Sequence, residues 1–176
     1  MERTQQTVSP MSNAGRNTYV REHLSSAMLE LLAEKPLGEI SVSELCGRAG
    51  VGRTSFYRNF ETKEEIVKGH IHRLLFTELA TAAEHQPLDR LIPLVFSHFR
   101  AHEGFYRLLG ERGLVYLLKE VLLTLCGYAP AQPKLAAYAS AFAAYSLYGW
   151  IEVWFQRGMR ESPEELAELF RGQGAG

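Results

Sequence analysis

The sequence predicts an all-α protein. Every periodic stretch of its 176 residues places apolar side chains at helical rather than strand spacing. The apolar runs are separated by Gly or Pro and not by the dipeptides that favour β-hairpins. With 46% hydrophobic and 22% charged residues, the composition is that of an ordinary globular protein, so we expect most of the chain to pack into helical cores.

The first helix is expected over residues 18–34, after a flexible arm at residues 1–16. The arm is rich in Ser, Thr, Pro and Gly and lacks the apolar stretch of a secretory signal. Apolar side chains then recur along one side of a helix, and Lys35-Pro36 ends the pattern. This stripe consists of Val20, Leu24, Ala27, Met28, Leu31 and Leu32.

Three later helices carry a common start signal, a Ser or Thr followed three residues later by Glu. In this arrangement each side chain satisfies a free backbone N–H of the first turn. The pairs are Ser41 with Glu44, Thr62 with Glu65, and Ser162 with Glu165, which also has Pro163 at the favoured first position. Thr62 and Glu65 start a helix expected at residues 63–83. Further helices are expected at residues 88–102, 113–125 and 134–157, with a short one at 105–109.

Two short helices joined by Gly-Val-Gly are predicted between Ser41 and Phe60. This arrangement is a helix-turn-helix unit, whose second helix fits the major groove of DNA. Gly50 can adopt the left-handed conformation that ends the first helix. The apolar anchors of the unit are expected to be Ile40, Val42, Leu45, Val51, Phe56 and Phe60.

The other side of the second helix is polar and suits a nucleic acid. Its side chains can hydrogen-bond base edges and hold phosphates. Residues 48–63 contain four basic residues against Glu61 alone, a local charge of +3 in a chain whose net charge is -1. Lys63 also lies in the first turn of a helix, whose N–H groups attract phosphate. The predicted DNA contacts are Arg53, Thr54, Ser55, Tyr57, Arg58, Asn59 and Lys63.

The stretch AGVGRTSFYRNFETKEEI, residues 49–66, resembles the signature of the TetR family of bacterial transcription regulators. The family pattern reads A-G-V-S-x-x-T-[FL]-Y-x-[HY]-F followed by x-[SN]-K-[ED]-x-[LI], and the likeness extends over residues 18–71. The resemblance implies base contacts for Arg53 and Thr54. It implies contacts to phosphates and neighbouring base edges for the remaining polar positions, Ser55, Tyr57, Asn59 and Lys63.

Three positions depart from the family pattern. Gly52 replaces a helix-capping Ser, which should weaken the cap by roughly a few tenths of a kcal/mol. Asn59 replaces His or Tyr but keeps a hydrogen-bond donor. Ser43, which the resemblance adds to the DNA contacts, stands where many relatives have a basic residue, and Arg16 and Arg21 can compensate for the missing charge.

The run LAAYASAFAAYSLYGWI, residues 135–151, is uncharged and has 17 residues, fewer than the roughly 20 that a bilayer requires. We therefore expect a buried helix and no membrane span. Because a helix that is apolar all round is buried all round, one side should face its own domain and the other a partner subunit, unless the helix is purely internal. The predicted dimer interface is Ala141, Tyr148, Ile151, Leu166, Leu169 and Phe170.

Residues 148–170 resemble the closing stretch of a TetR subgroup that includes the activator of dihydroxyacetone kinase operons. The likeness rests on Gly149, Trp154, Gly158, Ser162 and Pro163. It implies that the effector is a protein or that no effector binds. The many aromatic residues of this half either form its core or line a ligand pocket between helices. The candidate pocket residues are Phe99, His102, Phe105, Tyr106, Tyr116 and Tyr145.

His98 and His102 lie one helical turn apart, the spacing at which two imidazoles can share a zinc ion. The spacing indicates no third ligand, although Glu103, His70 and His72 could converge on the pair. Ordinary polar surface is therefore favoured, and no metal or cofactor is predicted. The two cysteines lie too far apart in sequence for a CxxC pair, which indicates a reducing cytosol.

Together these observations predict a cytoplasmic DNA-binding regulator with a helix-turn-helix domain at residues 17–62, a regulatory and dimerisation domain at 63–171 and a tail at 172–176. A homodimeric repressor on palindromic double-stranded DNA, released by a small-molecule or protein effector, is favoured. An activator working with a protein co-regulator and a helical interaction module that does not bind DNA stay open. An enzyme is disfavoured because the sequence lacks a phosphate-binding Gly loop and a nucleophile elbow and contains a single Asp.

Overall fold

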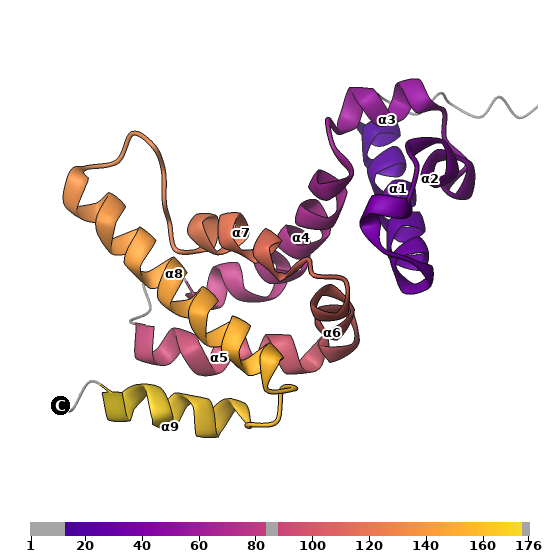
Figure 1. Ribbon diagram of the computed structural model, residues 1–176. Helices are drawn as coiled ribbons and strands as arrows, with labels where there is room; N and C mark the ends of the chain where they lie inside the picture. The colour runs from indigo at the N-terminus through magenta and orange to yellow at the C-terminus, as the bar shows by residue number, and fades with distance from the viewer. Residues whose placement is uncertain (1–12, 84–87, 174–176) are drawn as a thin grey trace, which may run out of the picture. The chain divides into compact units, whose positions relative to one another are not determined.

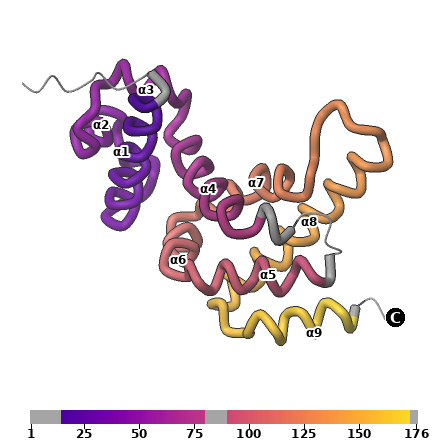
Figure 2. Tube along the Cα trace, turned by 180° about the vertical axis from the view of Figure 1, so that it is seen from behind, coloured from indigo at the N-terminus to yellow at the C-terminus, as the bar shows by residue number. Residues whose placement is uncertain are grey.

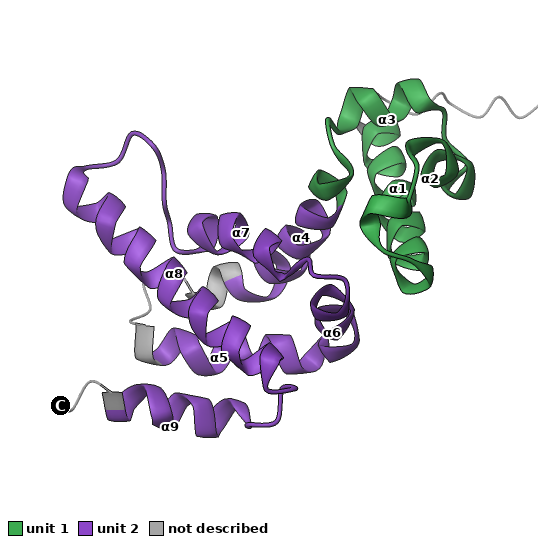
Figure 3. Cartoon of the chain, viewed as in Figure 1, with its two compact units in different colours: residues 1–66 green, residues 67–176 purple. Residues whose placement is uncertain are grey.

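The described residues of the computed structural model, 13–83 and 88–173, form helices and turns and contain no strand (Figure 1). The predicted all-α class is therefore confirmed. The chain divides into two compact units, residues 1–66 and 67–176 (Figure 3). Helix α4, Lys63–Ala83, begins in the first unit and continues in the second. Most of the predicted arm at 1–16 and the end of the predicted tail at 172–176 lie outside the described residues.

The first unit is built from α1 (Asn13–Glu34), the 3-10 turn η1 (Leu37–Glu39), α2 (Val42–Ala49), α3 (Arg53–Asn59) and the start of α4. Helix α1 packs against both α2 and α3. Its predicted apolar stripe lies in the core, apart from the half-buried Val20. The helix begins five residues before the predicted start, and among these residues Gly15 disfavours a helix most, at a cost of about 1 kcal/mol.

The second unit contains the remainder of α4 and five further α-helices (Figure 2). These are α5 (Leu88–Ala101), α6 (Glu103–Glu111), α7 (Leu118–Leu125), α8 (Lys134–Gln156) and α9 (Pro163–Gln173), with the 3-10 turn η2 (Val115–Leu117) before α7. Helix α5 packs along α9, and α7 packs along α8. The core of this unit is rich in aromatic side chains, among them Phe96, Phe99, Tyr106 and Trp154.

Two predicted boundaries in the second unit were wrong. The short helix expected at 105–109 extends over the whole of α6. The helix expected from residue 113 begins later, with η2, because Gly113 adopts a left-handed φ of 67° that interrupts a helix. Helix α8 covers the uncharged run, and none of the described helices combines the length and the apolar character that a membrane crossing needs.

All three predicted helix starts are present. In each, the hydroxyl accepts a hydrogen bond from the backbone N–H three residues further on: Ser41 from Glu44 at 3.1 Å, Thr62 from Glu65 at 3.3 Å, and Ser162 from Glu165 at 3.2 Å. At the start of α9 the bond is reciprocal, because Glu165 Oε2 accepts from the Ser162 N–H at 2.7 Å. The helix starts are thus fixed by contacts that are local in sequence.

The turn between α8 and α9 is held by side chains of the same unit. Gly158 and Met159 both adopt positive φ, 78° and 56°. Arg100 Nη2 donates to the carbonyl of Met159 at 2.6 Å and to that of Glu161 at 3.0 Å. Trp154 Nε1 donates to the same Glu161 carbonyl at 3.1 Å. These bonds hold the turn in a conformation that non-glycine residues rarely adopt.

Candidate nucleic-acid interface

The turn between α2 and α3 has the predicted geometry. Gly50 ends α2 in the left-handed conformation, with φ 66° and ψ 28°, and the N–H of Val51 donates to the Cys46 carbonyl at 3.0 Å. Gly52 precedes α3 with φ -77° and ψ 150°, the backbone of an N-cap residue, and makes no side-chain cap bond. The side-chain cap bond that a Ser would supply is absent at Gly52, and the lower stability expected from it stays a prediction. Helix α3 then begins at Arg53.

One side of α3 is anchored in the core and the opposite side is exposed. Phe56 is buried, and its neighbour Tyr57 is 57% exposed. Four exposed side chains, Arg53, Thr54, Tyr57 and Arg58, occupy positions i, i+1, i+4 and i+5. At 3.6 residues per turn they cover an arc of about 140° of the helix surface. We call these four residues the α3 arc. It presents a continuous row of hydrogen-bond donors, two of them guanidinium groups.

Asn59 and Arg21 hold the end of α3 in place. Asn59 Nδ2 donates to the Ser55 carbonyl at 2.9 Å, and the Asn59 carbonyl accepts from Arg21 Nη2 at 3.1 Å. The Arg21 guanidinium also lies 4.9 Å from the centroid of the Phe60 ring. Sequence reasoning placed Asn59 among the DNA contacts and Arg21 among the compensating charges. The structure uses both side chains inside the unit, because the last turn of α3 leaves carbonyls that need donors.

Lys63 is also held inside the first unit. Its Nζ donates to the carbonyls of Leu37 at 2.7 Å and Ile40 at 2.5 Å, and its side chain is half-buried. The sequence predicted that this ammonium contacts a phosphate, whereas in the structure it is hydrogen-bonded within its own unit. The two carbonyls belong to η1 and the residue after it, and the ammonium satisfies both.

Arg48 pairs with acidic residues of α1. Its guanidinium donates to Glu34 at 2.9 and 3.3 Å and to Glu30 at 3.4 Å, and this contact holds the pKa of the Glu34 carboxyl below its usual range. The predicted local charge of +3 therefore overstates the charge available to DNA. Within the described residues, Arg53 and Arg58 make no ion pair. The positive charge of the α3 arc comes from these two residues.

The other predicted contacts flank the arc. Ser43 is exposed in the first turn of α2, and Ser55 is half-buried on α3. Beside the arc lies a hollow of about 780 Å³ between the first turns of α1, the Gly50–Gly52 turn and α3. Arg16, Ser55 and Arg58 are among the side chains that line it. Arg16 of α1 therefore lies at the edge of this hollow next to α3, in addition to Arg58 of α3 itself.

The second unit exposes a row of apolar side chains along α8. We call Leu135, Tyr138, Phe142, Tyr145 and Val153 the α8 stripe. The first four are spaced by three, four and three residues, so they lie on one side of the helix. Their exposed fractions are 84, 69, 72 and 52%, and that of Val153 is 53%. So many large apolar side chains in one exposed row mark an interaction surface.

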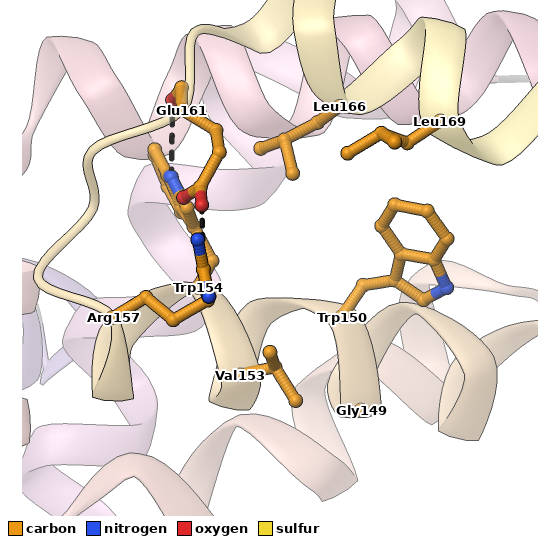
Figure 4. Close-up of a pocket in the computed structure, with 8 residues that line it drawn as sticks. All are labelled: Gly149, Trp150, Val153, Trp154, Arg157, Glu161, Leu166 and Leu169. Carbon is orange, nitrogen blue, oxygen red and sulfur yellow. Dashed lines mark hydrogen bonds and ion pairs between the residues drawn. The ribbon is translucent and has the colours of Figure 1, made fainter.

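A groove of about 550 Å³ between α8 and α9 continues this surface (Figure 4). Trp150 of α8 faces Leu166 and Leu169 of α9 across the groove, and Val153 of α8 also lines it. The ion pair between Arg157 Nε and Glu161 Oε1, at 2.5 Å, lies at one end. Val153 belongs to the stripe and to the groove, and Leu169 is 56% exposed, so the two surfaces are continuous.

The six residues predicted for the dimer interface differ in their burial. Tyr148, Ile151 and Leu166 are buried in their own unit, so they are not available as the main contacts of a partner. Ala141 and Phe170 are half-buried, and Leu169 is exposed. The correction has a simple cause. An apolar pattern all round a helix does not indicate which side packs on its own domain.

The predicted ligand pocket is also divided. Phe99 and Tyr106 are fully buried and pack against each other with ring centroids 4.1 Å apart. Tyr116 and Tyr145 are exposed, while Phe105 and His102 are half-buried. Some of these side chains thus belong to the core and others lie at the surface, so the structure does not bring them together as the lining of one pocket.

Glu78 joins the two histidines that the sequence singled out. His98 Nδ1 lies 2.7 Å from Glu78 Oε2, and His102 Nε2 lies 2.6 Å from Glu78 Oε1. On its other side, His98 Nε2 lies 2.8 Å from the Tyr106 hydroxyl. Sequence reasoning missed Glu78 because it lies on α4, 20 residues before His98, and no spacing rule links residues of two separate helices.

Two family models match separate segments of the chain. The family model of bacterial regulatory proteins, tetR family, matches residues 24–69. The model of a transcriptional regulator C-terminal region matches residues 113–172. Together the two matches cover more than half of the chain. No curated protein matches the sequence.

Solved structures share the fold at low sequence identity. Lin0861 from Listeria innocua is 15% identical with a TM-score of 0.69, and the alignment covers 94% of each chain. NalD, the secondary repressor of the MexAB-OprM multidrug efflux pump in Pseudomonas aeruginosa, is 18% identical with a TM-score of 0.54, over 89% of this chain and 96% of NalD. The dihydroxyacetone kinase operon activator DhaS is 15% identical with a TM-score of 0.52, over 88% of this chain and 93% of DhaS.

Proposed function

Because the chain belongs to the TetR family of bacterial regulatory proteins, we propose that it binds palindromic operator DNA as a dimer and represses transcription until an effector releases it. The observation that supports this most directly is the α3 arc. Four exposed polar side chains lie on a helix whose other side is fixed by the buried Phe56. A rigid helix with such a polar side suits the major groove, which is wide enough to admit it.

Within the arc the side chains have different tasks. Arg53 opens the helix, and recognition helices contact base edges with their N-terminal residues. Its guanidinium suits the paired acceptors of guanine, and the adjacent Thr54 suits the methyl group of thymine. Tyr57 and Arg58 would hold phosphates, together with Ser43 at the start of α2 and Ser55 beside the arc.

Lys63 and Asn59 take a different role in this proposal from the one that sequence reasoning gave them. Lys63 fixes η1 to the start of α4, and Asn59 fixes the last turn of α3. They would position the arc without contacting DNA themselves. The N–H groups at the start of α4 remain a candidate phosphate contact.

Two copies of α3 are needed for tight, specific binding, since one recognition helix makes few contacts. We propose that the α8 stripe pairs with the same stripe of a second chain, as a two-fold interface requires. Its spacing of three and four residues is the spacing of side chains in paired helices. The groove between α8 and α9, with Leu169 at its edge, would extend this interface. The half-buried Ala141, next to Phe142 of the stripe, and Phe170, whose ring packs on Trp150, would contribute their exposed parts.

The direction of regulation is proposed on physical grounds. NalD is described as a repressor and DhaS as an activator, and both share the fold of this chain. Repression requires only that the bound dimer occupy the DNA. Activation requires a further surface for another protein. The simpler mechanism is therefore proposed, with an activator that works together with a protein co-regulator as the alternative.

Selection of random DNA by the purified protein, followed by sequencing, tests the proposal. A palindromic consensus is expected. Arg53→Ala should weaken binding to the selected site by about 1–3 kcal/mol and relax the preference at one base pair, while Tyr57→Ala should weaken all sequences alike. Arg90→Ala, which removes an exposed arginine of the second unit, is the matched control. Wild-type affinity in both α3 variants would refute the assignment of the arc.

A further inference from the structure

The cluster of Glu78, His98 and His102 has no part in the proposed DNA binding or dimerisation. All three residues belong to the second unit, with Glu78 on α4 and His98 and His102 on or next to α5. One potential ligand atom from each lies within 4.8 Å of the other two. We propose that these three side chains bind a divalent transition-metal ion of the zinc type, with water in the remaining coordination positions.

The donor set suits such an ion. Imidazole nitrogen and carboxylate oxygen both bind zinc at about 2.0–2.2 Å, so two ligands of a tetrahedral ion lie about 3.3 Å apart. The two hydrogen bonds from the histidines to Glu78 are 2.6 and 2.7 Å long. The two histidines contact different oxygens of the Glu78 carboxylate, and one ligand atom from each residue lies within 4.8 Å of the others, so the side chains must shift by up to about 1.5 Å to bring all three to one ion. The side chains of Glu78 and His102 are 43 and 29% exposed, so they have room to move and the ion can enter from solvent.

The third ligand is already held in place. The side chain of His98 is 1% exposed, and the Tyr106 hydroxyl contacts its Nε2. A histidine that binds a metal through one nitrogen usually donates its other N–H to a neighbouring acceptor. Here Nδ1 would bind the ion, the ring proton would move to Nε2, and the Tyr106 oxygen would accept from it. His102 would bind through Nε2 with its proton on Nδ1, so neither neutral ring loses a proton overall.

The chemistry of the donors also selects among cations. Imidazole favours zinc, cobalt, nickel and copper, whereas magnesium and calcium prefer sites built from oxygen. The two neutral imidazoles and one carboxylate leave a net positive charge on the bound ion. The open positions are therefore suited to water or to a further anionic ligand.

Calorimetric titration of the full chain with Zn²⁺, after removal of any affinity tag and treatment with a chelator, tests the site. One ion per chain is expected for the wild type, and no comparable binding of Mg²⁺. Glu78→Gln and His102→Gln should each weaken Zn²⁺ binding at least about tenfold, since the loss of a supporting residue alone costs that much. His72→Gln, which changes an exposed histidine of α4 outside the cluster, should bind like the wild type.

Cobalt provides a second measurement that does not depend on the variants. Co²⁺ bound by nitrogen and carboxylate ligands should absorb visible light more strongly than aqueous Co²⁺, and added Zn²⁺ should remove the signal. Equal Zn²⁺ affinity in the wild type and both cluster variants would overturn the proposal. A wild-type Co²⁺ spectrum identical to that of the aqueous ion would do the same. Neither readout involves DNA, so the outcome is independent of the proposed regulatory function.

Discussion

Replacing Phe142 with lysine should separate the proposed dimer. Phe142 lies at the centre of the α8 stripe and is 72% exposed in the single chain. Burying a complete Phe side chain stabilises by about 1.5–3 kcal/mol, so burying the exposed part contributes about 1–2 kcal/mol in each subunit. A two-fold interface contains the side chain twice, which gives about 2–4 kcal/mol per dimer. The dimer dissociation constant should therefore rise by about 30-fold to 1,000-fold.

Sedimentation velocity over a dilution series measures this change directly. Tyr128→Lys is the matched control, because Tyr128 is an exposed aromatic residue between α7 and α8, outside the stripe. Ile151→Ala provides the contrast, since Ile151 is fully buried and its truncation should lower the free energy of unfolding by about 2–5 kcal/mol. A Phe142→Lys protein that dissociates at the same concentration as the wild type would refute the stripe as the interface.

Three further predictions concern stability and reactivity. Gly52→Ser should raise the free energy of unfolding by roughly a few tenths of a kcal/mol, because the backbone suits a cap and an added Cβ meets no atom within 4 Å. Gly50→Ala, at φ 66°, should lower the free energy of unfolding by about 1 kcal/mol. Melting curves that show no such difference in sign would contradict both expectations. Lys63→Met should lower the free energy of unfolding in urea by about 1–3 kcal/mol, because two hydrogen bonds are lost. Weaker DNA binding at unchanged stability would instead indicate a phosphate contact. Burial raises the pKa of the Cys46 thiol, and raises that of the Cys126 thiol to about 11. Mass spectrometry should therefore find both thiols slow to alkylate at neutral pH until the protein unfolds. Rapid alkylation of the native protein would show that the thiols are accessible.

The helices and the exposed side of α3 could be predicted because their signals are local in sequence. A capping Ser or Thr and the Glu after it lie within one turn, and so do the members of the α3 arc. The recognition helix was predicted from the Gly-Val-Gly turn, the polar side opposite the apolar anchors and the resemblance of residues 49–66 to the family signature, all of which are local in sequence. These parts of the prediction therefore depended on no distant residue.

The differences between the sequence expectations and the structure concern side chains whose partners are remote in sequence. Arg48 is paired with Glu34, 14 residues earlier, and Lys63 donates to the carbonyl of Leu37, 26 residues earlier. Neither contact has a sequence pattern. The same limit applies to Glu78, whose approach to His98 depends on how α4 and α5 pack. Sequence alone gives the charge of such residues and leaves open whether that charge reaches solvent.

The connection between α8 and α9 has a consequence for proteolysis. It carries two exposed arginines, Arg157 and Arg160, and so offers trypsin two sites on a loop. A protease must pull its substrate into an extended conformation, but the bonds from Arg100 and Trp154 hold this backbone in left-handed turns. Cleavage there would first require those bonds to break. The last helix should therefore survive digestion together with the body to which it belongs.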